Sequence, residues 1–238
     1  MKKTFLLLIS IITFSVTNSS AQNLAQFFDE ADAIFSKYVS NGKVDYASLF
    51  KNEAELASVL DLAKNSKVST SNAATYQAFW INAYNLSVIK GIIDNYPIKS
   101  PLDKKGFFDK TTYNLGGTTI TLNDIENKKL RAKFDDARFH FVLVCGAKGC
   151  PPLIAKAYRP ETLNKQLEAQ TKKALTNNEF VKISNGKVAL SEIFKWYKED
   201  FVKKGQNEVD FLNKFRNEKV SPDAKVTYYT YDWRLNSK

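Results

Sequence analysis

Residues 71–97 read SNAATYQAFWINAYNLSVIKGIIDNYP, and this stretch decides the fold of the chain. Ser71 and Asn72 are residue types that cap the N-terminus of a helix, and Pro97 ends a helix shortly after about Asn95. Between these ends, apolar side chains recur at helical spacing on two stripes: Phe79, Ala83, Leu86 and Ile93 on one, and Ile81, Val88 and Ile92 on the other. A helix that is apolar on nearly every side is a buried one, so the sequence predicts a central helix here.

Asn82 and Asn85 interrupt the apolar surface of this helix with two amide groups. A buried amide without hydrogen-bond partners costs about 1–3 kcal/mol, so each amide must find partners inside the domain. One interpretation is structural: the amides tie the helix to neighbouring backbone. The other is functional: they orient a substrate or a catalytic group in a pocket, and Asn82, Tyr84 and Asn85 are then candidate substrate-binding residues.

Elements on both sides of this helix complete the predicted fold. Helical spacing predicts helices over residues 23–38 and 53–63. Gly116-Gly117 and Asn185-Gly186 predict the turns of two hairpins. The other predicted elements are helices over residues 123–133 (with Asn123 and Glu126 as a capping box), 160–175, 191–197 and 209–217, and strands over residues 138–145 and 225–231. This order predicts a single α+β domain, with a buried central helix packed on a mostly antiparallel sheet, hairpins and peripheral helices.

The first 21 residues have the pattern of a secretory signal peptide. Lys2 and Lys3 precede the apolar run Phe5–Val16, and small residues follow at Ser19–Ala21. The apolar run is shorter than the roughly 20 residues that a membrane-spanning helix needs. We therefore expect a signal peptide over residues 1–21, an N-terminal helical flank over 22–70 and the core of the same domain over 71–238. The mature protein is expected to be soluble, without a transmembrane segment, in the periplasm or secreted.

The chain carries a formal charge of +10, but the kinds of basic residue do not indicate a nucleic-acid partner. Only five of the 35 basic residues are Arg, and the basic residues are scattered, usually beside Asp, Glu or Asn. Proteins that read nucleic acids favour Arg for its bidentate hydrogen bonds. We interpret the charge as a solvated, Lys-rich surface, and expect the partner to be a small molecule, a peptide or a component of the cell envelope.

The stretch RFHFVLVCGAKGCPP, residues 138–152, contains the only His and both Cys residues of the chain. A Cys–His hydrolase needs a thiolate beside a general base, which makes His140, Cys145 and Cys150 candidate catalytic residues. If residues 138–145 form a strand, His140 and Cys145 face opposite sides and lie roughly 16 Å apart. His140 is then either a core residue whose ring nitrogens have hydrogen-bond partners, or the one histidine that an enzyme of this sequence can use.

The two cysteines have a second interpretation, as a disulfide. An exported location permits a Cys145–Cys150 bond, and Gly146 and Gly149 allow the tight loop that it needs. A disulfide would leave no thiol nucleophile. The spacing lacks the CxxC pattern of zinc sites, so no metal and no cofactor are expected.

The end of the chain, Tyr231–Asn236, reads YDWRLN. An aromatic terminal strand usually closes a sheet. Asp232 is also a candidate to bind substrate or to orient His140, as the third member of a catalytic triad does.

Four stretches together resemble the family known as domain of unknown function 547: FWINAYN at 79–85, LNDIENKKLR at 122–131, HFVLVCGAKGCPPL at 140–153 and YDWRLN at 231–236. The resemblance implies an α+β domain over about residues 74–197, found in exported bacterial proteins and in plant proteins with an upstream leucine-zipper segment. It implies no established reaction. Relatives often have a Glu-His pair where this chain has Glu126-Asn127, so a histidine present in relatives is absent here.

Two classes of function remain open. The first is a thiol- or histidine-dependent hydrolase or transferase, with Asn82, Asn85, Glu126 and His140 around a polar pocket and one cysteine as nucleophile. On this hypothesis the catalytic candidates are Glu126, His140, Cys145 and Cys150, and the substrate-binding candidates are Asn82, Tyr84, Asn85 and Asp232. The second class is a non-catalytic binding or scaffold domain stabilised by a Cys145–Cys150 disulfide.

Overall fold

A computed structural model describes residues 22–203 and 205–238. The central helix is α4 (Ala73–Ile93), which is capped by the side chain of Asn72 and is buried along almost its whole length, as predicted. Residues 22–38 are helical, and with α2 (Tyr46–Lys51) and α3 (Glu53–Asn65) they cover one side of α4. The short α5 (Leu122–Asp124) and the π-helix η2 (Ile125–Arg131) contact α4 as well.

The predicted hairpins are present. β3 (Thr112–Leu115) pairs antiparallel with β4 (Thr118–Thr121), and β5 (Val181–Ser184) pairs antiparallel with β6 (Lys187–Ser191). In the first turn both Gly116 and Gly117 have positive φ, at +58° and +73°, which is why glycine suits this two-residue turn. β7 (Lys225–Tyr229) joins β6 in parallel, and β1 (Val39–Ser40) pairs with β2 (Lys43–Val44).

The arrangement of the strands differs in detail from the expectation of one sheet. The described residues form three small sheets, β1–β2, β3–β4 and β5–β6–β7, and helices make up most of the surroundings of α4. The fold is mixed α+β in one domain, as predicted. Its other elements are the 3-10 helices η1 (Pro101–Asp103) and η3 (Ala137–Phe141), and the helices α6 (Leu163–Thr176), α7 (Ile193–Trp196), α8 (Lys198–Phe201) and α9 (Glu208–Phe215).

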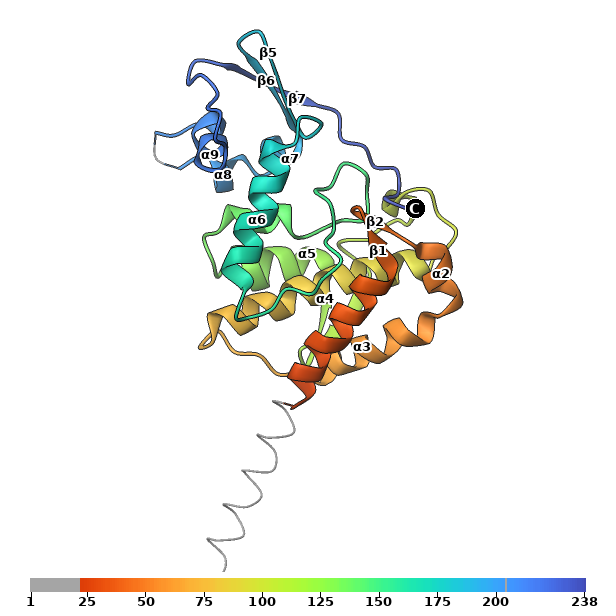
Figure 1. Cartoon of the computed structure of the whole chain (residues 1–238). Helices are drawn as coiled ribbons and strands as arrows, with labels where there is room; N and C mark the ends of the chain where they lie inside the picture. Colours follow the sequence, from red (N-terminus) through yellow and green to blue (C-terminus); the bar gives the residue numbers. More distant parts are fainter. Residues whose placement is uncertain (1–21, 204) are drawn as a thin grey trace, which may run out of the picture.

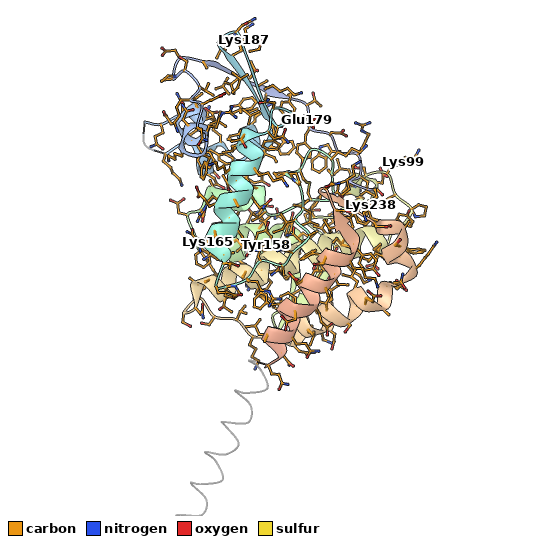
Figure 2. All side chains as sticks on the ribbon, viewed as in Figure 1. Lys99, Tyr158, Lys165, Glu179, Lys187 and Lys238 are labelled. Atoms are coloured by element: carbon orange, nitrogen blue, oxygen red, sulfur yellow. A yellow bond between two sulfur atoms is a disulfide. The ribbon has the colours of Figure 1, made fainter. Side chains whose placement is uncertain are left out.

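The core has two parts. One surrounds α4, and the other lies between α6, α8, α9 and the sheet β5–β6–β7. Figure 1 shows α4 with the N-terminal helices in one half of the molecule, the three-stranded sheet in the other, and α6 running between the halves. In Figure 2, Lys187 marks the far end of the β5–β6 hairpin, and Glu179 marks its base beside the end of α6. Cys150 packs against both parts of the core, at their junction.

Residues 138–145 do not form the predicted strand. Ala137–Phe141 is the 3-10 helix η3, and the chain then continues as buried, irregular backbone. The side chain of Asn85 takes the place of a neighbouring strand: its amide donates to the carbonyl of Val142 and its oxygen accepts from the N–H of Val144, both at 2.9 Å. A largely apolar segment is therefore held here by one side chain rather than by a sheet.

A second difference concerns the start of the helix after β4. The cap is Thr121, whose hydroxyl accepts from the N–H of Asp124, and Asn123 lies inside the helix. The predicted capping box of Asn123 and Glu126 is therefore wrong, and Glu126 is free to make other contacts.

The predicted signal peptide, residues 1–21, lies outside the described residues. Within the described part of the chain, no helix is long and apolar enough to cross a membrane.

Candidate functional site

A cavity of about 270 Å³ lies at the junction of the two parts of the core. Five of the candidate residues line it: Tyr84, Glu126, His140, Cys145 and Cys150. The rest of its lining is mostly aromatic and apolar: Phe108, Asn123, Leu143, Pro151, Ile193, Trp196, Tyr197, Tyr231 and Trp233. The expectation that His140 and Cys145 face opposite sides of a strand is wrong, because both lie at the same cavity.

His140 is among the most enclosed polar groups of this cavity, with a side chain only 3% exposed. Its Nε2 lies 2.6 Å from Oδ2 of Asp200 in α8. On the other side of the ring, Nδ1 lies 3.8 Å from Oε1 of Glu126. The imidazole thus stands between two carboxylates, and it directs one nitrogen at each.

Arg131 completes this group through a bidentate contact with Asp200. Its Nε lies 2.6 Å from Oδ2, and its Nη2 lies 3.0 Å from Oδ1. Burial alone would raise the pKa of Asp200, but the hydrogen bonds from His140 and Arg131 outweigh it and hold this pKa well below its usual value. Asp200 is therefore ionised at neutral pH, and Arg131 balances its charge.

The ring of Tyr197 contacts both the imidazole and the guanidinium. It stacks on His140 with ring centroids 4.0 Å apart, and the guanidinium carbon of Arg131 lies 4.9 Å from the centre of the tyrosine ring. Burial and the nearby Glu126 raise the pKa of the Tyr197 hydroxyl, and they do the same for Tyr84. Both hydroxyls therefore stay protonated and available as donors.

The π-helix η2 explains how Glu126 and Arg131 reach the same group. In a π-helix the repeating hydrogen bond joins residues five apart, so residues 126 and 131 lie nearly above one another. In an α-helix, with 3.6 residues per turn, the same two positions would point in clearly different directions. Asn127, where relatives often have His, also contacts the guanidinium of Arg131 through its side-chain oxygen.

Cys145 and Cys150 are within disulfide-bonding distance and are paired as a disulfide, with Cα atoms 6.5 Å apart. This agrees with the second interpretation of the two cysteines. The hydroxyl of Tyr231 lies 3.0 Å from Sγ of Cys150 and 3.1 Å from Sγ of Cys145. The N–H of Cys145 donates to Sγ of Cys150 at 3.0 Å.

The amides of Asn82 and Asn85 are buried and directed at backbone outside the cavity lining. Asn85 holds the backbone after η3, through Val142 and Val144. Asn82 does the same for the segment before α6: its oxygen accepts from the N–H of Tyr158, and its Nδ2 donates to the carbonyls of Ala78 and Tyr158. The two asparagines thus fix the two irregular segments that surround the site.

Asp232 lies outside the lining of the cavity, and it does not contact His140. It pairs with Arg234 two residues later, and this contact lowers the pKa of Asp232 to about 2. The carboxylate that orients His140 is Asp200 instead. Its segment, WYKED at 196–200, has the composition of a solvated charged turn, and nothing in the sequence distinguishes Asp200 from the charged residues around it.

An aromatic group forms one wall of the cavity. Trp196 stacks on Trp233 with ring centroids 5.9 Å apart, and Tyr231 packs against both rings at 5.0 and 4.8 Å. Trp196 is 45% exposed, which is unusual for so large an apolar side chain.

As for metals, residues 22–203 and 205–238 contain no cluster of three or more His, Cys, Asp or Glu side chains arranged to hold an ion.

Comparison with known families gives one match. The model of a family described as a protein of unknown function, DUF547, matches residues 68–175, slightly less than half of the chain. This confirms the resemblance seen in the sequence motifs. The matched residues include Tyr84, Glu126, Arg131, His140 and the cysteine pair, whereas Tyr197, Asp200 and Tyr231 lie beyond it. No curated protein and no solved structure matches the chain.

Proposed function

We propose that this chain, whose residues 68–175 match the DUF547 family, is a hydrolase or group transferase that uses His140 as a general base. One observation carries the proposal: a nearly fully buried imidazole lines a cavity and is held by an ionised carboxylate 2.6 Å away. General bases of this type need an imidazole that is fixed in orientation and a partner that stabilises its charged form. Asp200 meets both requirements.

The contacts of the imidazole support a distinct role for each nitrogen. Asp200 has no proton of its own at neutral pH, so Nε2 carries the proton that is donated to it. The lone pair of the neutral ring is then on Nδ1, on the side of Glu126 and the cavity. There it can take a proton from a water molecule or from the hydroxyl of a second substrate as that oxygen attacks an electrophilic carbon. The resulting imidazolium is stabilised by Asp200 and by Glu126, 3.8 Å away.

Two neighbouring groups complete the proposed chemistry. Arg131 keeps Asp200 ionised and in place through its bidentate contact. Tyr84 lines the same cavity, and because burial keeps its hydroxyl protonated, it can donate to an oxygen that gains negative charge during the reaction. His140 thus acts as the catalytic residue, Tyr84 as an oxyanion donor, and Asp200 and Glu126 as positioning residues.

The cysteine pair favours histidine chemistry over thiol chemistry. A thiol hydrolase needs a free thiolate, and a paired cysteine supplies none. In the oxidised chain we therefore assign no nucleophilic role to Cys145 or Cys150.

A panel of chromogenic substrates tests this proposal: nitrophenyl esters, an anilide and nitrophenyl glycosides. We expect the wild-type chain to hydrolyse at least one of them. His140→Gln and Asp200→Asn should lower kcat/KM by about a hundredfold or more, in line with the loss of a general base. Glu199→Gln is the matched control, because Glu199 is adjacent, 83% exposed and also within 3.2 Å of Arg131. If His140→Gln matches the wild type on every substrate, the proposal is wrong.

The second candidate is a binding domain without catalysis, and the exposed aromatic wall favours it. Trp196 and Trp233 present stacked rings at the cavity, and such rings bind sugars, aromatic groups and apolar side chains. The same panel discriminates between the two functions. A ligand that quenches tryptophan fluorescence, with no turnover and no effect of His140→Gln, would support the binding domain.

We also propose that the chain is exported. The cysteine pair at disulfide-bonding distance and the absence of a membrane-spanning helix among the described residues are compatible with this location. Cell fractionation of the full chain and of a variant without residues 2–21 tests it. Export predicts that only the full chain reaches the periplasm or the medium, and equal cytoplasmic retention of both would contradict it.

A further inference from the structure

The cysteine pair stands in an environment that differs from that of a merely structural disulfide. Both sulfurs line the cavity beside His140, and both residues are partly exposed. The buried hydroxyl of Tyr231 lies within 3.1 Å of each sulfur and has no other hydrogen-bond partner among the described residues. Disulfide sulfurs are weak acceptors, so this hydroxyl gains little from them unless one sulfur becomes charged.

The two sulfurs have unequal surroundings. Sγ of Cys150 receives two donors, the hydroxyl of Tyr231 at 3.0 Å and the N–H of Cys145 at 3.0 Å. Sγ of Cys145 is near the hydroxyl alone, at 3.1 Å. Donors that point at a sulfur stabilise its thiolate, and a stabilised thiolate is the better leaving group in disulfide exchange.

We infer that Cys145–Cys150 is a thiol–disulfide exchange centre, in which a substrate thiolate attacks Cys145 and Cys150 leaves as the thiolate. In the first step a bond forms between the substrate sulfur and Sγ of Cys145, the bond between the two cysteines breaks, and its electron pair goes to Sγ of Cys150. In the second step another substrate thiolate attacks the substrate sulfur of the mixed disulfide, and Cys145 leaves. Two substrate thiols are thereby oxidised to a disulfide, and the two cysteines are reduced, taking up the two thiol protons.

The surroundings of Tyr231 hold its hydroxyl over the sulfurs. Its ring packs against Trp196 and Trp233, and its N–H donates to the side chain of Glu192 at 2.9 Å. Gly149 approaches the ring so closely that an added Cβ would lie 2.9 Å from it, which is why a glycine is needed in the cysteine loop at this point. Burial also raises the pKa of Tyr231, so the hydroxyl remains a donor at neutral and moderately alkaline pH.

This inference goes beyond the proposed hydrolase and is tested separately from it. The oxidised full chain is mixed with glutathione or with a short dithiol peptide, and protein thiols are counted over time after acid quenching and alkylation. We expect Tyr231→Phe to slow the appearance of thiols about tenfold, the effect of losing one hydrogen bond to a charged group. Tyr229→Phe is the matched control, since its hydroxyl donates to the carbonyl of Phe180 and should leave the rate unchanged. Faster reaction with one of the two thiols identifies a small thiol or a peptide thiol as the substrate.

A second measurement keeps the inference testable if Tyr231→Phe does not fold. In the single-thiol variants Cys145→Ala and Cys150→Ala, the pH dependence of alkylation gives the pKa of the remaining thiol. We expect the pKa of Cys150 to lie below the ordinary value of about 8.5 and below that of Cys145. The mixed disulfide with glutathione should be found on Cys145. Equal rates for wild type and Tyr231→Phe, a thiol pKa of Cys150 at or above the ordinary value, or a mixed disulfide on Cys150 would each overturn the inference. The exchange assay counts protein thiols, whereas the hydrolase assay measures the product released from a chromogenic substrate, so the two proposals can fail independently.

Discussion

Nε2 of His140 lies 2.6 Å from Oδ2 of Asp200, which is sixty residues further along the chain. This contact joins η3 to α8, and therefore joins the family-matched segment to a part of the chain beyond the match. Arg131 holds the same carboxylate from η2. The group around this ionised side chain is thus assembled from three short elements.

The first prediction concerns the contribution of Asp200 to stability. The pKa of Asp200 in the folded chain lies below its unfolded value of about 4, because the hydrogen bonds from His140 and Arg131 outweigh the effect of burial. Its stabilising contribution is therefore fully present above about pH 4 and is lost as the pH falls from there through the folded pKa. We expect Asp200→Asn to lower the free energy of unfolding by about 2 kcal/mol at neutral pH.

Urea unfolding of both chains at neutral pH and in steps down to about pH 3 measures this difference. The difference in the free energy of unfolding between wild type and Asp200→Asn should become smaller as the solution becomes more acidic. Glu199→Gln, at a position that is 83% exposed, should stay within about 0.5 kcal/mol of the wild type throughout. If the difference in the free energy of unfolding is the same in acid as at neutral pH, Asp200 stabilises the fold for some reason other than its charge.

The second prediction concerns the proton on the imidazole. His140 is the only histidine of the chain, so a histidine-labelled sample without an affinity tag gives one pair of ring nitrogen signals. In the neutral ring we expect the proton on Nε2, because the ionised Asp200 accepts a hydrogen bond from that atom. Nitrogen NMR distinguishes the two tautomers by chemical shift. A neutral ring protonated at Nδ1 would be incompatible with the proposed base. In Asp200→Asn, the preference for Nε2 should weaken.

The third prediction concerns Asn85. Its side chain donates a hydrogen bond to the carbonyl of Val142 and accepts one from the N–H of Val144. All three residues are buried. Asn85→Ala leaves two backbone groups without partners, and we expect a loss of about 3 kcal/mol in the free energy of unfolding. Asn65→Ala is the control, because its exposed amide bonds only to Asp61 one helical turn earlier. Similar stabilities of the two variants in urea would show that Asn85 does not hold the segment after η3.

The fourth prediction concerns the aromatic wall. Trp196 is 45% exposed, so Trp196→Ala should change the free energy of unfolding by less than about 1 kcal/mol. If the wall binds substrate, the same variant should raise KM about tenfold on the best substrate of the panel and alter kcat little. Phe50→Ala, with equal exposure and an aromatic contact with Tyr96, should leave KM unchanged. An unchanged KM in Trp196→Ala would remove the wall from the binding site.

Much of the fold follows from local signals in the sequence. Asn72 predicts the start of α4, and Pro97 predicts that the helix ends shortly before it. The burial of α4 follows from the apolar residues on all its sides. The hairpin β3–β4 has the predicted turn because Gly116 and Gly117 both adopt positive φ. These features depend on residues that are close in sequence, and for that reason they can be recognised without the structure.

The features that the sequence does not predict depend on distant contacts. Residues 138–145 are apolar enough to resemble a central strand. The amide of Asn85, 57 residues or more away in sequence, supplies instead the hydrogen bonds that a neighbouring strand would give. Asp200 acquires its importance only from Arg131 and His140, and its own segment resembles an ordinary charged turn. Residue type and position indicate Glu126, His140 and Tyr84 as candidates, whereas their actual partners require the three-dimensional arrangement.

The separation of Tyr231 from the cysteines in sequence has a consequence for the order of events during synthesis. Cys145 and Cys150 are five residues apart, so they can meet as soon as their loop leaves the ribosome. Tyr231 is synthesised 81 residues after Cys150. Until then its hydroxyl cannot lie over the two sulfurs, so any bond that forms between them in that interval forms without the tyrosine. The nascent chain and the finished chain thus present the same two sulfurs in chemically different settings.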